Sequence, residues 1–382
     1  MADYDVGIVG AGVHGASAAR HLAERGVRVV VYERDTPASG PTGFSSAICR
    51  AYYTNPFLAK VAHESLELLS DFGAFTDGGY SDFRRTGALF LHPPKDADAV
   101  RHTVRMLGDV GTRVEILEGE GIDVYLPGVD RSGIALAVSE PDAGYADPVA
   151  TTHGLLAHAK RLGAEVRHHT RVTSFEPGPT VRVVHQAGED TVDRLLLAAG
   201  PWTTPLIATA GATLPLVAER HVVARCSFPS GVNVPYVFAD LAEGFYFKPE
   251  PGDQFLLGSL HPTTPFDLDD RIPGIGHGES SELVRAVSTR VPALRDATLA
   301  GGWASLYDVS PDWQPVIGEV AEHIFVDTGT SGHGFKLAPA LGGYVAGLVL
   351  GEPDPGLEQF HPDRFGHDER LPSGYGSARI IG

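Results

Sequence analysis

The stretch from Tyr4 to Glu33 reads YDVGIVGAGVHGASAARHLAERGVRVVVYE, and the fold can be argued outward from it. A short apolar run ends in Gly10, Gly12 and Gly15, and an alanine-rich segment at helical spacing leads to a second apolar run. This order predicts a strand, a tight turn, a helix and a second strand. In such a unit the first glycine permits the turn, the second lets the backbone approach a pyrophosphate, and the third allows the helix to contact the strand closely. The stretch therefore predicts a dinucleotide-binding unit.

Glu33 closes the second apolar run, where a carboxylate can accept both hydroxyls of a ribose. The amides at the start of the helix offer partial positive charge to the phosphates. A glycine-rich turn that binds nothing has the same local pattern. Because the strand, the helix and the acid are all in register, we favour the dinucleotide site over the plain turn.

Two later segments indicate FAD rather than NAD. Leu195–Thr203 reads LLLAAGPWT, an apolar strand that ends in a small-residue turn, and Thr328–Gly351 is a glycine-rich loop that opens a long helix. Both suit a second and a third contact with one extended cofactor. A domain for NAD alone keeps its strands contiguous, whereas long mixed segments separate them here.

Composition bounds the class of protein. The 382 residues are 43% hydrophobic and 20% charged, which is enough to bury a sizeable core in two intertwined domains. The formal charge of −18 disfavours nucleic acid and anionic membranes as partners. The longest apolar run, Leu337–Leu350, contains three glycines and is shorter than the ~20 residues that span a bilayer. We expect no membrane association.

Location and metal content are also expectations at this point. The start, MADYDVGIVGAG, has acidic residues where an export signal has basic ones. Cys49 and Cys226 lie far apart, and neither has a partner at metal-ligand spacing. We expect a cytoplasmic protein with no metal site.

Four blocks resemble the D-amino acid oxidase-like FAD-dependent oxidoreductase family, in the branch of sarcosine oxidase, glycine oxidase and dimethylglycine dehydrogenase. They are GAGVHGASAARHLAERG followed by YERD; TGFSSAICRAYY; EPDAGYADPVATTHGLLAHAKRLGAEVRHHTRVTSFE leading to LLLAAGPWT; and GWASLYDVSPDWQPVIG followed by SGHGFKLAPALG. Together they span most of the chain and keep the family's order.

The resemblance implies an α/β fold. A Rossmann-like FAD-binding domain is expected from three segments, residues 1–80, 145–215 and 300–382, with an inserted α+β substrate domain of mixed β-sheet from residues 81–144 and 216–299. Local patterns agree, because 57–72 has helical spacing while 87–91, 133–138, 219–226, 236–240 and 245–259 read as strands. The polar tail after Phe360 is expected on the surface.

The resemblance also places five residues around a substrate. Arg50 matches a carboxylate-binding arginine of sarcosine oxidase-like enzymes, and Lys336 matches a lysine that shares this task or serves the pyrimidine end of the flavin. A guanidinium fork and an ammonium suit the carboxylate of an amino acid. Tyr307 and Tyr246 match aromatic positions of the substrate pocket, and His261 lies in the segment of an active-site histidine. The alternatives are a surface ion pair for Arg50, a solvated helix-start residue for Lys336 and plain core positions for the tyrosines.

The residues that the resemblance assigns to FAD lie in all three segments. The amides of the loop from Gly329 to Phe335 can stabilise the negative charge of a reduced flavin, although a glycine-rich cap without a ligand is the alternative. The full set is Gly10, Gly12, Val13, His14, Gly15, Glu33, Arg34, Ser45, Ser46, Val172, Gly200, Trp202, Gly329, Gly332, His333, Gly334, Phe335 and Lys336.

Two departures from the resembled enzymes bear on the chemistry. Sarcosine oxidase-like enzymes attach the flavin through a cysteine, whereas the matching run here is Ser305–Asp308, reading SLYD. FAD should therefore be non-covalent. A lysine that speeds the reaction with oxygen in those enzymes is replaced by Leu256, so oxygen is expected to be a poor acceptor and another carrier is the alternative.

The expected reaction is hydride transfer from the carbon beside the nitrogen of a small amine or amino acid to the flavin N5, which gives an imine. A flavin monooxygenase shares the first glycine motif, but SGHGFK stands where that class has a second motif of GD type. An NAD-dependent dehydrogenase needs no third cofactor segment. A flavin-binding assembly protein without turnover needs neither Arg50 nor Lys336.

Overall fold

The structure is a computed structural model that describes residues 2–270, 272–367, 369–372 and 374–375. β1 (Tyr4–Val9), α1 (Val13–Glu24) and β2 (Val29–Tyr32) form the predicted N-terminal unit. β1 has parallel neighbours on both sides, and its last four residues are buried. A continuous apolar run is what a strand in the middle of a parallel sheet requires.

The first sheet joins three distant parts of the chain. Its strand order is β17-β18-β11-β1-β2-β8, with β10 and β9 continuing from β11. Strands β18, β11, β1, β2 and β8 are parallel, while β17 is antiparallel to β18. The further strands are β8 (Glu165–Arg167), β9 (Val172–Glu176), β10 (Val181–His185), β11 (Gly188–Leu197), β17 (Val316–Ala321) and β18 (Ile324–Thr328). The predicted α/β class with a Rossmann-like unit in three segments is confirmed.

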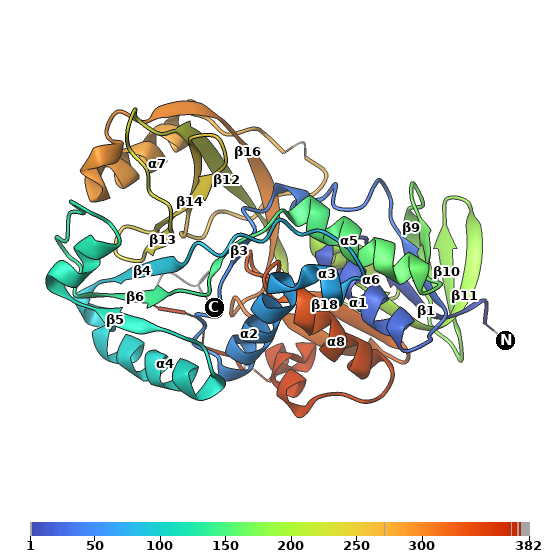
Figure 1. Cartoon of the computed structure of the whole chain (residues 1–382). Helices are drawn as coiled ribbons and strands as arrows, with labels where there is room; N and C mark the ends of the chain where they lie inside the picture. Colours follow the sequence, from blue (N-terminus) through green and yellow to red (C-terminus); the bar gives the residue numbers. More distant parts are fainter. Residues whose placement is uncertain (1, 271, 368, 373, 376–382) are drawn as a thin grey trace.

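The second sheet is mixed and has the order β16-β12-β15-β14-β13-β4-β6-β5, in which β13 and β4 are parallel and the other pairs antiparallel. It lies beside the first sheet (Figure 1). Its strands are β4 (Ala88–His92), β5 (Glu115–Leu117), β6 (Leu136–Glu140), β12 (Val217–Ser227), β13 (Val237–Asp240), β14 (Phe245–Glu250), β15 (Gln254–Ser259) and β16 (Thr298–Val309). The short pair β3 (Ile48–Cys49) and β7 (Gly144–Tyr145) stands apart. β16 stays in this sheet as far as Val309, so the second sheet extends past residue 300, where the FAD-binding domain is predicted to resume. The division of the chain into domains remains a prediction.

Helices cover both sheets. α1 packs against α5 and α8, and α2 packs against α8 and α4. The helices after α1 are α2 (Pro56–Ser70), α3 (Phe72–Phe75), α4 (Ala97–Val110), α5 (Pro148–Arg161), α6 (Thr203–Ala208), α7 (His277–Arg290) and α8 (Ala338–Val349). Among the described residues, no helix combines the length and apolar character that crossing a bilayer demands.

Local sequence sets where two of these helices begin. Asn55 and Asp147 each precede a proline, and each side chain accepts two backbone N–H groups of the first turn. The first backbone N–H groups of a helix have no partner within it. A proline at the first position has no N–H to satisfy, and the side chain before it accepts the N–H groups that follow. α2 therefore begins after the segment that carries Arg50, and α5 begins after β7.

The expectation that the tail after Phe360 lies on the surface is wrong for two of its residues. Arg364 is 6% exposed and pairs with Asp312, whose carboxylate accepts two of its N–H groups at 2.9 and 3.0 Å. Tyr375 is 5% exposed, and its hydroxyl lies 2.9 Å from that of Tyr52. A polar composition did not reveal these two anchors, because each depends on a partner far away in the sequence.

Candidate active site

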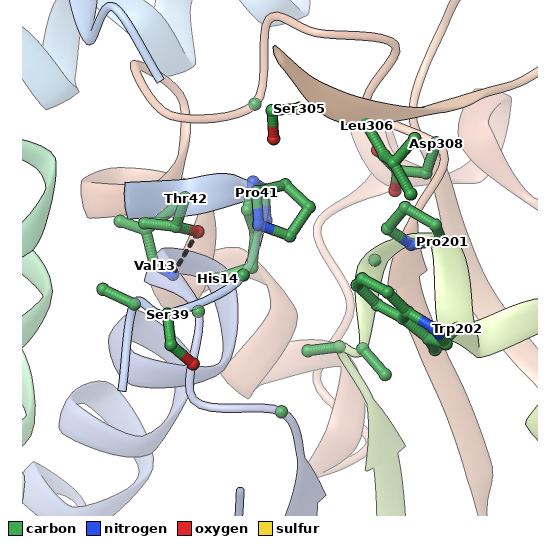
Figure 2. Close-up of a pocket in the computed structure, with 18 of the residues that line it drawn as sticks. Val13, His14, Ser39, Pro41, Thr42, Pro201, Trp202, Ser305, Leu306 and Asp308 are labelled. Carbon is green, nitrogen blue, oxygen red and sulfur yellow. Dashed lines mark hydrogen bonds between the residues drawn. The ribbon is translucent and has the colours of Figure 1, made fainter. Parts of the chain in front are cut away.

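A cavity of about 430 Å³ lies where the first sheet meets the second. Four segments that are distant in the sequence surround it, namely the glycine turn with α1, the loop Ser39–Ser46, the turn Gly200–Trp202 and the strand end Ser305–Asp308 (Figure 2). Of the predicted cofactor residues, the lining contains Gly10, Gly12, Val13, His14, Glu33, Arg34, Ser45, Ser46, Val172, Gly200, Trp202, Gly332, Gly334 and Phe335. The predicted segments are therefore brought to one space.

The glycine turn has the geometry that the motif requires. Gly10 has φ +105°, and a Cβ added there would lie 2.5 Å from the carbonyl oxygen of Ala198. A Cβ on Gly15 would lie 2.0 Å from the carbonyl oxygen of Gly10. Gly15 is outside the lining and serves the close packing of the turn on α1. The backbone at Gly12 is open apart from Thr42, whose hydroxyl accepts the Val13 N–H at 3.2 Å (Figure 2).

Glu33 lines the cavity. Its carboxylate accepts the backbone N–H groups of Ala11 and Asp35, each at 2.9 Å, which fixes the side chain at the end of β2. The guanidinium of Arg34 stacks on the Trp202 ring at 3.8 Å, so the turn that contains Trp202 contacts the chain next to Glu33. Flat groups of this kind suit an adenine ring.

The glycine-rich loop before α8 also lines the cavity, through Gly332, Gly334 and Phe335. A Cβ on Gly332 would lie 2.2 Å from the Tyr307 ring, which explains why a glycine stands there. Gly329 is outside the lining, and its N–H donates to Asp308 at 2.6 Å. His333 is buried behind the loop, where it contacts the Trp313 carbonyl and the Tyr53 hydroxyl; burial lowers its pKa to about 3. Gly329 and His333 therefore shape the loop from outside the cavity.

Arg50 and Lys336 form a buried basic cluster next to the cavity, outside its lining. They are 4% and 7% exposed. The guanidinium of Arg50 donates to the Tyr52 carbonyl and lies 4.5 Å from the Tyr53 ring, and the ammonium of Lys336 donates to the His333 carbonyl at 3.3 Å. Burial and the charge of Arg50 hold the pKa of Lys336 well below its ordinary value. An anion entering this cluster would stabilise both charges.

Glu140 is the acid beside this cluster, and no sequence pattern pointed to it. Its carboxylate is fully buried and accepts the N–H groups of Ala51 at 2.6 Å and Tyr52 at 3.1 Å. Burial raises its pKa to about 7, although these hydrogen bonds and Arg50 act in the opposite direction. Glu140 thus holds the backbone that carries Arg50.

The other three predicted substrate residues lie in different surroundings. Tyr246 lines the cavity, with its hydroxyl 2.8 Å from that of Ser46, and burial raises its pKa to about 12. Tyr307 lines the cavity and stacks on His221 at 3.9 Å. His261 is exposed beyond the end of β15, outside the lining, and its ring contacts the Glu243 carbonyl. The structure brings the two tyrosines together and leaves His261 apart.

Several lining residues were not predicted. Asp327 is the last residue but one of β18, and Asp308 is the last residue but one of β16. Both line the cavity, as do His221 and Thr42. A polar residue at the carboxyl end of a buried strand, as in IFVD, is a signal that could have found Asp327. Among the described residues, His, Cys, Asp and Glu side chains form no group that could hold a metal ion.

Residues 5–348 match the family described as DAO, FAD dependent oxidoreductase. The chain belongs to this family. Monomeric sarcosine oxidase from a Bacillus species is 27% identical over 91% of this chain and 92% of its own. The 4-methylaminobutanoate oxidase of Paenarthrobacter nicotinovorans is 28% identical over 90% of this chain but 43% of its own length.

Solved structures show the same fold. L-proline dehydrogenase from P. horikoshii has a TM-score of 0.88 at 24% identity, covering 96% of this chain and 99% of its own. Glycine oxidase from Geobacillus kaustophilus has a TM-score of 0.82 at 24% identity, covering 95% and 99%. The chain is thus an FAD-dependent oxidoreductase of the DAO family, as the motifs predicted.

The residues present fit FAD. The glycine turn leaves open backbone at Gly12, Glu33 follows β2 where units of this kind have an acid for the ribose, and Gly332 and Gly334 of the glycine-rich loop line the same cavity. Cys49 and Cys226 are both buried and outside the lining. With Ser305 in the lining where the resembled oxidases have cysteine, no thiol is placed to attach the flavin, and the FAD is held non-covalently.

Proposed function

We propose that this enzyme oxidises the C–N bond of a small amine or amino acid to an imine. Bound FAD supplies the acceptor for the hydride that leaves the carbon beside the nitrogen. The observation that carries the proposal is the buried pair of Arg50 and Lys336 next to the cavity, because a guanidinium and an ammonium side by side can bind a carboxylate. The names of the relatives, which include sarcosine oxidase and glycine oxidase, support the same substrate class.

Arg50 and Lys336 bind the carboxylate of the substrate in this proposal. A guanidinium presents paired N–H donors to both carboxylate oxygens, and the ammonium adds a third donor. Because both cations are buried, their attraction is weakly screened by water. They orient the substrate with its nitrogen toward the side of the cavity that Tyr246 and Tyr307 line.

The tyrosines are unsuited to act as bases. Burial raises the pKa of Tyr246 to about 12 and raises that of Tyr307 further above its ordinary value, so both hydroxyls stay protonated near neutral pH. They can donate hydrogen bonds and exclude water. The amine must therefore be bound in its neutral form, which an apolar, partly enclosed site favours by lowering the pKa of an ammonium. The neutral lone pair then assists hydride departure, and water hydrolyses the released imine.

Anaerobic mixing of the FAD-loaded protein with D-, L- and N-methyl amino acids tests the proposal. We expect at least one of them to bleach the flavin band, and its decarboxylated amine to act more weakly. Bleaching by NADPH and by none of the amines would favour the flavin monooxygenase. A flavin that no donor bleaches would favour the assembly protein.

The electron acceptor and the cellular location are part of the same proposal. Oxygen or another electron carrier reoxidises the flavin, and the substrate is a small molecule. Cys49 and Cys226 are unpaired, which suits the reducing conditions of a cytoplasm.

A further inference from the structure

His14 and Asp327 form a buried pair in the wall of the FAD cavity. Nδ1 of His14 lies 2.9 and 3.0 Å from the two carboxylate oxygens of Asp327. The Asp327 side chain is fully buried and that of His14 is 14% exposed. Because an ionised carboxylate only accepts hydrogen bonds, Nδ1 carries a proton in both charge states of the ring. The state of Nε2 is then what distinguishes a neutral His14 from a cationic one.

Nε2 of His14 lies against the glycine-rich loop. It is buried, and a hydrogen bond with the Gly334 backbone favours its protonated form. It lies against Gly334, where an added Cβ would come within 2.6 Å of it. Both residues line the cavity, and His14 stands in the first turn of α1, whose amides face the phosphates of a bound dinucleotide.

The charges around His14 are predominantly acidic. Asp327 approaches from β18 and Asp308 from β16, and both line the same cavity. His333 approaches from the loop before α8, but burial keeps it neutral at ordinary pH. FAD adds a pyrophosphate with two negative charges. Without a cation at His14, the buried carboxylate of Asp327 would repel the cofactor that the cavity holds.

We propose that His14 and Asp327 form a proton-dependent clamp on FAD, which holds the cofactor more tightly when His14 is protonated. Protonation makes the pair neutral overall, so that the wall of the cavity carries no net negative charge at this pair when the anionic cofactor binds. Loss of that proton leaves one uncompensated negative charge beside an anionic cofactor. The direction of the pKa is consistent with this. Burial opposes protonation, but the charge and hydrogen bond of Asp327, the charge of Asp308 and a hydrogen bond with the Gly334 backbone outweigh it, so the pKa of His14 lies above its ordinary value.

The sign of the pH dependence follows from linkage. If FAD binds the protonated form better, FAD binding raises the pKa of His14, and the dissociation constant of FAD increases as pH rises through that pKa. We expect an increase of roughly tenfold from about pH 6 to about pH 9, within the usual range of coupling between two sites. Below the pKa the dissociation constant should level off.

Dilution of the FAD-loaded full chain at a series of pH values, with released flavin measured by fluorescence, tests the clamp. His14→Gln should bind FAD more weakly at low pH and lose most of the pH dependence. Asp327→Asn should also flatten the pH dependence, but should retain FAD at high pH because the repelling charge is gone. His21→Gln is the matched control, since His21 lies on the same helix with its Nε2 against the Pro339 carbonyl and a pKa of about 4.

The clamp is wrong if both His14→Gln and Asp327→Asn release FAD with the pH dependence of the unmodified protein, or if FAD binds more tightly as pH rises. Unfolding curves of each variant show whether a weaker affinity reflects lost stability, and if His14→Gln does not fold, Asp327→Asn decides alone. The measurement uses no amine, so its outcome is independent of the proposed reaction.

Discussion

Arg50 is the residue that we propose to bind the substrate carboxylate. Its guanidinium donates to the Tyr52 carbonyl and lies over the Tyr53 ring, both within its own segment. Arg50→Ala should raise KM about 10- to 100-fold while FAD stays bound, since a charge-assisted hydrogen bond contributes about 1.5–3 kcal/mol. Steady-state kinetics and the flavin spectrum measure the two effects. Arg113→Ala removes an exposed partner of Asp142 and serves as the control. Normal KM in Arg50→Ala would mean that the arginine is structural or that the substrate has no carboxylate.

Glu140 makes the stability of the protein depend on pH. Its ordinary pKa is 4.5 and burial raises it to about 7 in the folded protein. The folded state therefore binds the proton more tightly than the unfolded state does. The stability that this difference adds is fully present below about pH 4.5 and is lost as pH rises to about 7. A pKa that differs by one between the folded and unfolded states corresponds to about 1.4 kcal/mol, so the whole contribution is a few kcal/mol at most.

Glu140→Gln should remove this dependence of the free energy of unfolding on pH. The amide oxygen can still accept from Ala51 or Tyr52, but the group no longer ionises. Urea unfolding at several values between about pH 4.5 and about pH 7 measures the slope in both proteins. An unchanged slope in the variant would assign the titration to another group.

At the scale of elements, the glycine turn is a packing device as well as a binding site. Gly15→Ala places a Cβ 2.0 Å from the Gly10 carbonyl, so the turn must open and both stability and flavin content should fall. Gly108→Ala is the same substitution within α4, with no atom within 4 Å of the new Cβ. It should leave stability equal or raise it by up to about 1 kcal/mol. Similar unfolding free energies in the two variants would contradict the packing argument.

The glycine turn also shows what sequence can predict. Gly10 to Gly15 and the helix after them depend on neighbours in the chain, so the local pattern determined both the elements and their ligand. The pair of His14 and Asp327 joins residues 313 positions apart, and Glu140 contacts amides 88 and 89 positions away. No local pattern specifies such a pair, because it forms only when β6, β18 and α1 take their places in the fold. Most of the residues that the sequence suggested for the cofactor therefore line the cavity, whereas Asp327 and Glu140 were not predicted.

At the scale of the molecule, the FAD is held by three segments and by no covalent bond. Denaturation separates those segments, so the purified protein should be yellow and should release intact FAD into the supernatant when it is precipitated with acid. The absorbance of the supernatant and the mass of the unfolded chain measure this. Colour that stays with the precipitate would show that another side chain attaches the flavin.

We expect the reaction with oxygen to depend on the second sheet, from which Tyr246 on β14 lines the cavity. Lys248 follows two positions later on β14, so it lies on the same face, and its register partner on β15 is Leu256. Leu256 is apolar where the resembled oxidases have a lysine, and Lys248 is neutralised by Glu250 at 2.5 Å. A fixed, unpaired cation is what stabilises the superoxide-like charge formed when reduced flavin meets oxygen.

We therefore expect slow reoxidation by air and faster turnover with an artificial dye. Glu250→Gln should release the charge of Lys248 and speed the reaction of the reduced enzyme with oxygen, because the glutamine keeps the size of the side chain but supplies no counter-charge. Leu256→Lys should also speed the reaction of the reduced enzyme with oxygen. Leu256→Met is the matched control, because it adds no charge. Stopped-flow mixing of the photoreduced protein with oxygen gives the rate without any amine substrate. Rapid, stoichiometric hydrogen peroxide formation by the unmodified protein would instead place the oxygen site elsewhere and make the enzyme an oxidase.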